Sequence, residues 1–283
     1  MAKAAAKHDP QTGEILEDEK LPAIQQGGAV AEFDPTMYEQ EAGAGLSNIG
    51  MGDMSTPFLV VLQKGSPQCD ETTGEYIEGA KQGMFFDTVS KEMFNRDTGI
   101  IVIPCGFASR QVEWKPRESG GGWVAEHPID TPLLQTTKKN NKGHDVLPNG
   151  NLLVQTAYHY VMQIDPVTGA HKRAVISMTV TQLKKSRRWN SLMVGKKLPR
   201  RDGMGTFTPP IYAYYYRLTT IPEQNEKGSW FGIDLQEGGL VNHREHHSEA
   251  KAYAEAVSRG EVRTTPPADQ APSTSGESGD RAF

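Results

Sequence analysis

The stretch NLLVQTAYHYVMQIDPVTGAHKRAVISM, residues 151–178, decides the fold class expected for this chain. Up to residue 164 the even-numbered positions are apolar except at Thr156, whereas the odd-numbered positions include His159 and Gln163. A period of two residues is typical of a strand that has one face in a core and the other face in solvent. We therefore expect a half-buried β-strand here.

A turn signal follows this strand directly. DPVTG (165–169) separates it from a second run rich in β-branched residues, HKRAVISM (171–178). An Asp that starts a type I turn and a Gly that ends it in the left-handed conformation form a common hairpin connection. Related turn sequences stand at residues 70–74 and 97–99. We therefore expect the strands to pair antiparallel.

The rest of the chain contains more segments of the same kind. Short runs rich in β-branched and aromatic residues, which are typical of strands, are FLVVLQ (58–63), GIIVIPCGF (99–107), IYAYYYRLTT (211–220) and SWFGIDL (229–235). Capping residues and apolar spacing predict two helices, over residues 180–193 and 243–260. The expected fold class is mainly β with a few helices: an antiparallel Greek-key or OB-like barrel or sheet with flexible tails.

Composition divides the 283 residues into three parts. Residues 1–50 carry nine acidic and three basic side chains, a net charge of −6, and few large apolar residues, which predicts a disordered acidic arm. Residues 261–283 are rich in Pro, Ser, Gly and Thr and end at Phe283, which predicts a flexible tail. Residues 51–260 are the predicted β-rich core, which ends in a helix.

The sequence argues against several classes of protein. No apolar run approaches the roughly 20 residues that span a bilayer and no secretory signal is visible, so we expect a soluble cytoplasmic protein. The glycine-rich segment GGGW (120–123) lacks the Lys-Ser/Thr of a phosphate-binding loop, and no hydrolase or zinc-protease motif occurs. His243, His246 and His247 have helical spacing, which fits an exposed polar face better than a metal site. We expect no catalytic activity, cofactor or bound metal.

Charge is distributed very unevenly along the chain. The formal net charge is −5, but residues 171–201 hold 10 of the 30 Lys and Arg residues and no Asp or Glu. The remainder therefore holds 20 basic and 35 acidic residues, a net charge of −15. A polyanion would relieve the repulsion within the basic segment and release counterions, so this segment indicates a nucleic acid as the partner. The alternative is a solvated cationic face that the acidic ends of the chain balance.

Aromatic residues stand beside basic ones at three places in the sequence. Tyrosines at 214, 215 and 216 precede Arg217, Trp189 follows Arg188, and Trp114 stands before Lys115. Bases of a single strand stack on exposed aromatic rings, at about 1–3 kcal/mol per base, whereas core packing is the alternative role of each ring. The predicted nucleic-acid-binding residues are Trp114, Lys115, Arg117, Lys172, Arg173, Lys184, Lys185, Arg187, Arg188, Trp189, Lys196, Lys197, Arg200, Arg201, Tyr214, Tyr215, Tyr216 and Arg217.

Several of these segments together resemble a known family. SPQCDETTGEYIEGAKQGMFF, VEWKPRESGGGW, AVISMTVTQLKKSRRWNSLM and the aromatic strand after them are similar to proteins of tailed-phage replication regions described as single-stranded-DNA-binding proteins, over roughly residues 52–240. The resemblance implies an OB-fold, single-stranded DNA as the partner and the cytoplasm of a bacterial host as the location. It also implies a C-terminal tail that recruits replication proteins, with Glu277, Asp280 and Phe283 at its tip. From Glu261 onward this tail has four acidic and two basic residues, a net charge of −2, which is less acidic than is usual in that family.

The resulting hypothesis is a non-catalytic protein that binds and protects single-stranded DNA during phage DNA replication, recombination or repair. Its sequence specificity is expected to be low, because stacking accepts any base. Three alternatives remain open at this point. One is a virion or host-takeover component whose basic segment meets an acidic protein. The others are a strand-annealing recombinase that assembles into rings or filaments, and an enzyme such as a Mg²⁺-dependent nuclease.

Overall fold

The computed structural model describes residues 36–50, 53–141, 143–226, 228–262 and 264–267. The chain divides into two units, Met1–Ile49 and Gly50–Phe283. The described part of the first unit holds one short helix, α1 (Thr36–Glu39), followed by turns. The predicted acidic arm up to residue 35 and the predicted tail from residue 268 onward lie outside the described residues.

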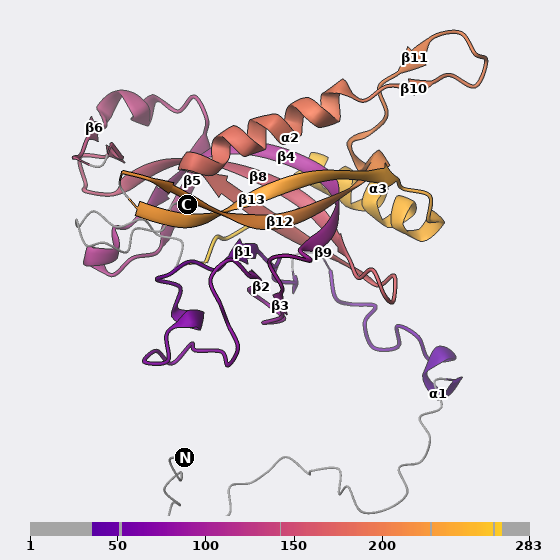
Figure 1. The fold of residues 1–283 in the computed structure, drawn as a ribbon, viewed down its shortest axis with the longest axis horizontal. Helices are drawn as coiled ribbons and strands as arrows, with labels where there is room; N and C mark the ends of the chain where they lie inside the picture. The colour runs from indigo at the N-terminus through magenta and orange to yellow at the C-terminus, as the bar shows by residue number, and fades with distance from the viewer. Residues whose placement is uncertain (1–35, 51–52, 142, 227, 263, 268–283) are drawn as a thin grey trace, which may run out of the picture. The chain divides into compact units, whose positions relative to one another are not determined.

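One large sheet dominates the second unit. Among the described residues it contains eight strands, in the order β13–β12–β4–β8–β7–β6, with β5 beside β4 and β9 beside β8. Its strand pairs are antiparallel, and the sheet curls into a half-barrel (Figure 1). The strands are β4 (Ile100–Trp114), β5 (Trp123–Pro128), β6 (Lys138–Lys139), β7 (Asp145–Val146), β8 (Leu152–Ile164), β9 (His171–Thr179), β12 (Tyr214–Asn225) and β13 (Gly228–Leu240).

Smaller elements surround this sheet. The other strands form a three-stranded sheet of β1 (Leu59–Val61), β2 (Phe85–Asp87) and β3 (Met93–Phe94), and a hairpin of β10 (Leu198–Pro199) and β11 (Thr206–Phe207). The two longer helices are α2 (Leu183–Gly195) and α3 (Arg244–Ser258). Short 3₁₀ helices cover Pro67–Cys69, Arg117–Ser119, Pro132–Thr136, Val180–Gln182 and Ile211–Ala213.

The predicted fold class, mainly β with a few helices around an antiparallel sheet, is confirmed. Both predicted helices are present, and each of the predicted strand runs contributes a strand. No helix in the described part of the chain has the length and apolar character needed to cross a membrane.

The DPVTG turn joins β8 to β9 as the sequence predicts. The Asp165 carboxylate accepts hydrogen bonds from the Val167 amide at 2.8 Å and from the Thr168 hydroxyl at 2.7 Å. Gly169 has a φ of +74°, a left-handed conformation that glycine adopts without strain. The turn therefore closes an antiparallel hairpin in the centre of the sheet.

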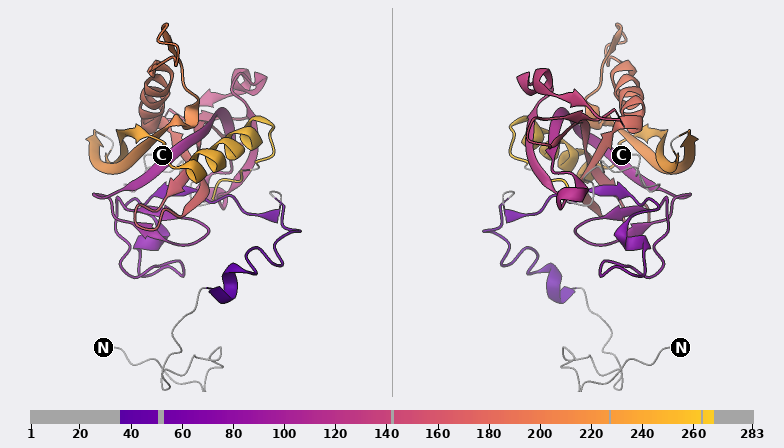
Figure 2. Two further views of the ribbon diagram at one scale, coloured as in Figure 1. Left: turned by 90° about the vertical axis from the view of Figure 1, so that its right-hand side faces the viewer. Right: turned by 90° about the vertical axis from the view of Figure 1, so that its left-hand side faces the viewer.

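Side chains are buried on both faces of the central sheet. On one face Tyr158 and Met162 of β8 belong to a cluster with Tyr253 of α3. On the other face Val161 belongs to a cluster with Trp189 of α2. The two helices therefore cover opposite faces of the sheet (Figure 2), and we call the two clusters the α3-side core and the α2-side core.

The prediction that β8 is only half-buried is wrong. His159 is 0% exposed and Gln163 is 5% exposed, although both belong to the face expected in solvent. Around His159, this face is covered by α2, which follows β9 in the chain. Alternation within one strand shows which residues are polar but not whether another element covers them.

The first residues of the predicted C-terminal tail lie on the core. Val262 packs against the α3-side core, and Pro266 is buried. The predicted boundary at residue 261 therefore comes too early. Val262 and Pro266 bury apolar surface against the core. The average composition of the segment is polar, so it did not predict these contacts.

Candidate nucleic-acid interface

Helix α2 separates its core-facing and basic side chains onto two faces. Ser186 and Trp189 are buried, whereas Lys184, Arg187 and Arg188 are exposed. Residues three and four apart share one side of a helix, so this spacing places all three basic side chains in solvent. The helix therefore carries the centre of the basic segment on the outside of the sheet (Figure 1).

Trp189 anchors α2 to the sheet. Its ring is fully buried and stacks on His159 of β8, with 4.4 Å between the ring centroids and 14° between the planes. Tyr216 of β12, which is 1% exposed, contacts the same ring edge to face at 5.7 Å. The prediction that Trp189 and Tyr216 stack on bases is therefore wrong, because neither ring has a free face. Trp189 lies on the side of the amphipathic helix that has to face the core.

Burial keeps the imidazole of His159 uncharged. Its Nε2 lies 2.8 Å from Ser186 Oγ on α2. Desolvation in the core lowers the pKa of His159 to about 3, compared with about 6.5 for an exposed histidine. The unfolded chain therefore takes up a proton near pH 6.5, which the folded protein does not take up until the pH is far lower.

We expect the protein to lose stability as the pH falls from 6.5 to 4, with about 2–3 kcal/mol of the loss arising from His159. Above about pH 7.5 the residue is neutral in both the folded and the unfolded state, so its contribution is constant there. Urea unfolding at pH 7 and pH 4 measures the loss in the wild type and in His159→Gln. Glutamine can still bond Ser186 but does not titrate, so the variant should lose less stability. An equal loss in both proteins would contradict the role assigned to His159.

Acidic side chains of the β12–β13 hairpin neutralise part of the basic segment. Three cations form ion pairs there: Lys185 with Glu223 at 2.7 Å, Arg188 with Asp234 at 3.9 Å, and Lys196 with Glu237. A polyanion would have to compete with these carboxylates. The three predicted residues are thus less available to phosphates than the sequence indicates.

Five other basic residues of segment 171–201 are exposed: Lys184, Arg187, Lys197, Arg200 and Arg201. We call them the α2–hairpin cations. None of the five forms an ion pair within the described part of the chain. Two lie on α2, and the other three lie on or beside the β10–β11 hairpin, which extends from the end of α2 (Figures 1 and 2). The structure therefore places five of the ten basic residues of segment 171–201 on α2 and the hairpin that follows it.

The first two basic residues of the segment lie elsewhere. Lys172 pairs with the buried Asp87 at 2.8 Å. Arg173 lies 3.5 Å from Glu249 of α3 and over the ring of Tyr253, in the α3-side core. The ion pairs match the charges of Lys172 and Arg173 within the fold, so these two predicted cations are less available to phosphates than the sequence indicates. Adjacent residues of a strand point to opposite faces, so the two side chains diverge.

The predicted row of tyrosines is interrupted. Residues 211–213 form a 3₁₀ turn and not a strand. As a result Tyr212 packs against the α3-side core, whereas Tyr214 packs against the α2-side core. Lys196 lies over the Tyr214 ring, with 4.8 Å between its Nζ and the ring centroid. No continuous tyrosine surface is available in this part of the described chain.

Tyr215 links β12 to α3. Its hydroxyl donates a hydrogen bond to His246 Nδ1 at 2.8 Å, and His246 Nε2 donates to the carbonyl of Gly169 at 2.8 Å. His246 is 5% exposed, so the expected exposed polar face of the three histidines is wrong at this position. Tyr215 is half-buried and its hydroxyl is engaged by this hydrogen bond, whereas Arg217, two residues later on β12, is exposed.

The segment around Trp114 forms a hairpin end. Trp114 is 3% exposed in the α3-side core, and so its predicted stacking on bases is wrong. The Lys115 amide donates to the carbonyl of Gly122 at 2.9 Å, so the glycine-rich loop closes the β4–β5 hairpin. Lys115 is exposed and Arg117 is half-buried. Trp123, after the loop, is 37% exposed and is the more accessible of the two tryptophans.

Two exposed phenylalanines near the α2–hairpin cations were not predicted from the sequence. Phe107 of β4 is 42% exposed and contacts the ring of His159, beneath α2, at 5.1 Å. Phe207 on β11 is 39% exposed. The register of β4 against β8 shifts between Pro104 and Gly106, so period-two counting along β4 does not carry across this point. No sequence signal identified Phe107 as a surface residue.

Comparisons with known proteins identify one family. A family model described as Pam3 phage gp34-like protein matches residues 25–263. No curated protein and no solved structure matches the chain. The matched region includes α2, the β10–β11 hairpin and all five α2–hairpin cations, whereas Glu277, Asp280 and Phe283 lie beyond it and outside the described residues.

Proposed function

This chain belongs to the Pam3 phage gp34-like protein family, and on that premise we propose that it binds single-stranded DNA without catalysing a reaction. It would protect the strand in the host cytoplasm during phage DNA replication, recombination or repair. The observation that carries the proposal is the set of α2–hairpin cations, which are exposed and lack ion pairs in the described chain.

The size of this surface suits a nucleic-acid backbone. Helix α2 has 13 residues, a length of about 20 Å at 1.5 Å per residue, and the hairpin extends the row of charges. Each phosphate neutralised on a single strand contributes about 0.7 to the salt dependence of the logarithm of the binding constant. Five contacts therefore predict a slope of about −3.5.

Low sequence specificity follows from the chemistry of the same surface. Most of the exposed side chains of α2, namely Lys184, Arg187, Arg188 and Ser191, can bond phosphates, and the exposed Val194 offers no hydrogen bond to a base edge. Stacking is left to the exposed rings of Phe107 and Phe207, which accept any unpaired base. Phosphate contacts supply most of the affinity in this proposal, so binding should weaken steeply with salt.

Fluorescence anisotropy of a labelled oligo-dT at several salt concentrations tests the proposal. We expect binding with a slope of about −3.5 and weaker binding to a duplex of the same length. An external label is needed, because Trp114 and Trp189 are buried and should not be quenched directly by bases. Absence of oligo-dT binding at low salt, or binding that does not respond to salt, would overturn the proposal.

A second candidate is a protein-interaction component whose basic surface meets an acidic partner. The ion pairs of Lys185, Arg188 and Lys196 with carboxylates favour it, since they show this surface already accommodating acidic side chains. Competition distinguishes the two functions. Poly-glutamate should compete weakly with oligo-dT if DNA is the partner. If the partner is an acidic protein, poly-glutamate should bind to the chain and oligo-dT should not.

The tip of the C-terminal tail belongs to the same proposal. Glu277, Asp280 and Phe283 would contact replication proteins of the phage or host, while the core holds the DNA. Deleting residues 268–283 should leave the oligo-dT affinity within about twofold, because the α2–hairpin cations are all retained.

A further inference from the structure

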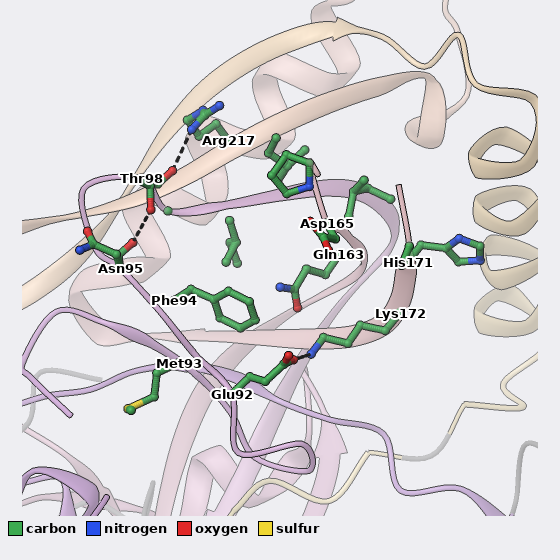
Figure 3. Close-up of a pocket in the computed structure, with 16 residues that line it drawn as sticks. Glu92, Met93, Phe94, Asn95, Thr98, Gln163, Asp165, His171, Lys172 and Arg217 are labelled. Carbon is green, nitrogen blue, oxygen red and sulfur yellow. Dashed lines mark hydrogen bonds and ion pairs between the residues drawn. The ribbon is translucent and has the colours of Figure 1, made fainter. Parts of the chain in front are cut away.

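A pocket of about 560 Å³ lies where the β3–β4 turn meets the β8–β9 turn (Figure 3). Its lining comes from residues 92–95, 98–101, 163–166, 170–172 and 217. Three separate parts of the chain thus converge on it. Its volume is within the roughly 300–1,000 Å³ that is common for sites of small ligands.

A buried amide at the centre of this pocket has an unused acceptor. Gln163 is 5% exposed, and its Oε1 has no hydrogen-bond partner among the described residues. Figure 3 shows the Gln163 amide directed into the pocket, toward Phe94 and Lys172. An unpaired buried acceptor destabilises the fold, and a ligand with an N–H or O–H donor would supply the missing hydrogen bond.

The side of the pocket next to Phe94 is held rigidly. Lys172 pairs with Asp87 at 2.8 Å, and its Nζ lies 5.4 Å from the centroid of the Phe94 ring. Burial raises the pKa of Asp87, but the bond from Lys172 and the Ser90 and Val89 amides outweighs this effect and holds that pKa below its ordinary value. The Lys172 charge is therefore matched, and Phe94 offers a fixed aromatic wall.

The mouth of the pocket carries a cation. Arg217 is exposed, and its guanidinium donates from Nη1 to the carbonyl of Thr98 at 2.9 Å, which fixes its position (Figure 3). It forms no ion pair within the described residues. An anionic group of a ligand could therefore bind here. The Asp165 carboxylate nearby is engaged in its own turn and does not neutralise Arg217.

We propose that this pocket binds one nucleotide, with its base between Phe94 and Gln163 and its phosphate at Arg217. The choice of a nucleotide rests on the proposed DNA-binding function and deepens it. Every nucleobase has a flat face for an aromatic wall, and each carries an N–H donor for Gln163 Oε1 on its Watson–Crick edge. The nucleotide is either free or part of a bound strand, and its chemistry is the same in both cases.

Titration of the full chain with dTMP, followed by NMR or calorimetry, tests the proposal. We expect dTMP to bind, and thymidine without its phosphate to bind several-fold more weakly. Gln163→Leu should weaken dTMP binding about tenfold and leave the melting temperature unchanged or higher, since it removes an unpaired buried acceptor. Arg217→Gln should reduce dTMP binding toward that of thymidine. The matched control Arg244→Gln, at an exposed position on α3, should have no effect.

Oligo-dT anisotropy of the same variants identifies the source of the nucleotide. Weakened binding of both dTMP and oligo-dT by Gln163→Leu places a nucleotide of the strand in the pocket. Weakened binding of dTMP alone supports a site for the free nucleotide. Failure of the wild type to bind dTMP, with oligo-dT binding unaffected by Gln163→Leu, overturns the pocket assignment while the proposed function stands. Binding of dTMP without any oligo-dT binding overturns the proposed function and supports the pocket.

Discussion

Replacing Trp189 with alanine should lower the free energy of unfolding by about 3–5 kcal/mol, the loss typical of a large buried aromatic side chain. Trp189 has no exposed surface, and its ring packs against the rings of both His159 and Tyr216. Alanine would leave a cavity at the junction of the helix with β8 and β12. The remaining contacts of α2 include ion pairs at the surface, which contribute little individually.

Urea unfolding monitored by circular dichroism measures this effect. Trp123→Ala is the matched control, because it removes the same ring from a site that is 37% exposed. Its cost should stay within about 1 kcal/mol. If Trp189→Ala costs no more than Trp123→Ala, the anchoring role of Trp189 is wrong and the ring would again be a candidate for stacking on bases.

Reversing four of the α2–hairpin cations should reduce affinity for oligo-dT at least about 100-fold at about 0.1 M salt. The variant is Lys184→Glu, Arg187→Glu, Arg200→Glu and Arg201→Glu. It replaces four attractive phosphate contacts with repulsive ones, and it should also reduce the magnitude of the salt slope by about 3. Lys185 and Arg188 are left unchanged, because reversal there would place a carboxylate beside Glu223 or Asp234 and disturb the fold.

A second variant with the same change of net charge provides the control. Lys64→Glu, Lys81→Glu, Lys138→Glu and Arg244→Glu alter exposed residues outside α2 and the β10–β11 hairpin. Oligo-dT affinity should fall by no more than about threefold, since a distant charge is screened within about 10 Å at moderate salt. Equal losses in the two variants would show that total charge, and not this surface, governs binding. Unchanged melting temperatures confirm that both variants are folded.

Local patterns predicted the elements of this fold well. The DPVTG sequence predicted the β8–β9 hairpin because the hydrogen bonds of Asp165 and the left-handed conformation of Gly169 all lie within the same five residues. Period-two alternation placed Tyr158 and Met162 on one buried face, and apolar spacing placed α3 correctly. Each of these signals depends on neighbours in sequence, although the burial of the second face of β8 depends on α2 as well.

The candidate site was predicted less accurately than the fold. The sequence located the basic segment, but it could not show that carboxylates of β12 and β13 pair with Lys185, Arg188 and Lys196. It also named Trp189 as a surface ring, whereas the amphipathic helix turns that ring into the core. The pocket at Gln163 had no sequence signal, because its lining comes from three segments that are far apart along the chain, around residues 92–101, 163–172 and 217.

The sequence by itself determined the antiparallel β class, the two helices, and the concentration of positive charge in residues 171–201. Only the tertiary structure decided which of those charges face solvent, which aromatic rings are buried, and where the pocket lies. The physical reason is the distance along the chain between the residues that interact. Turns, strand alternation and helix faces follow from interactions between residues a few positions apart, whereas burial and charge pairing depend on elements that meet only in the folded chain.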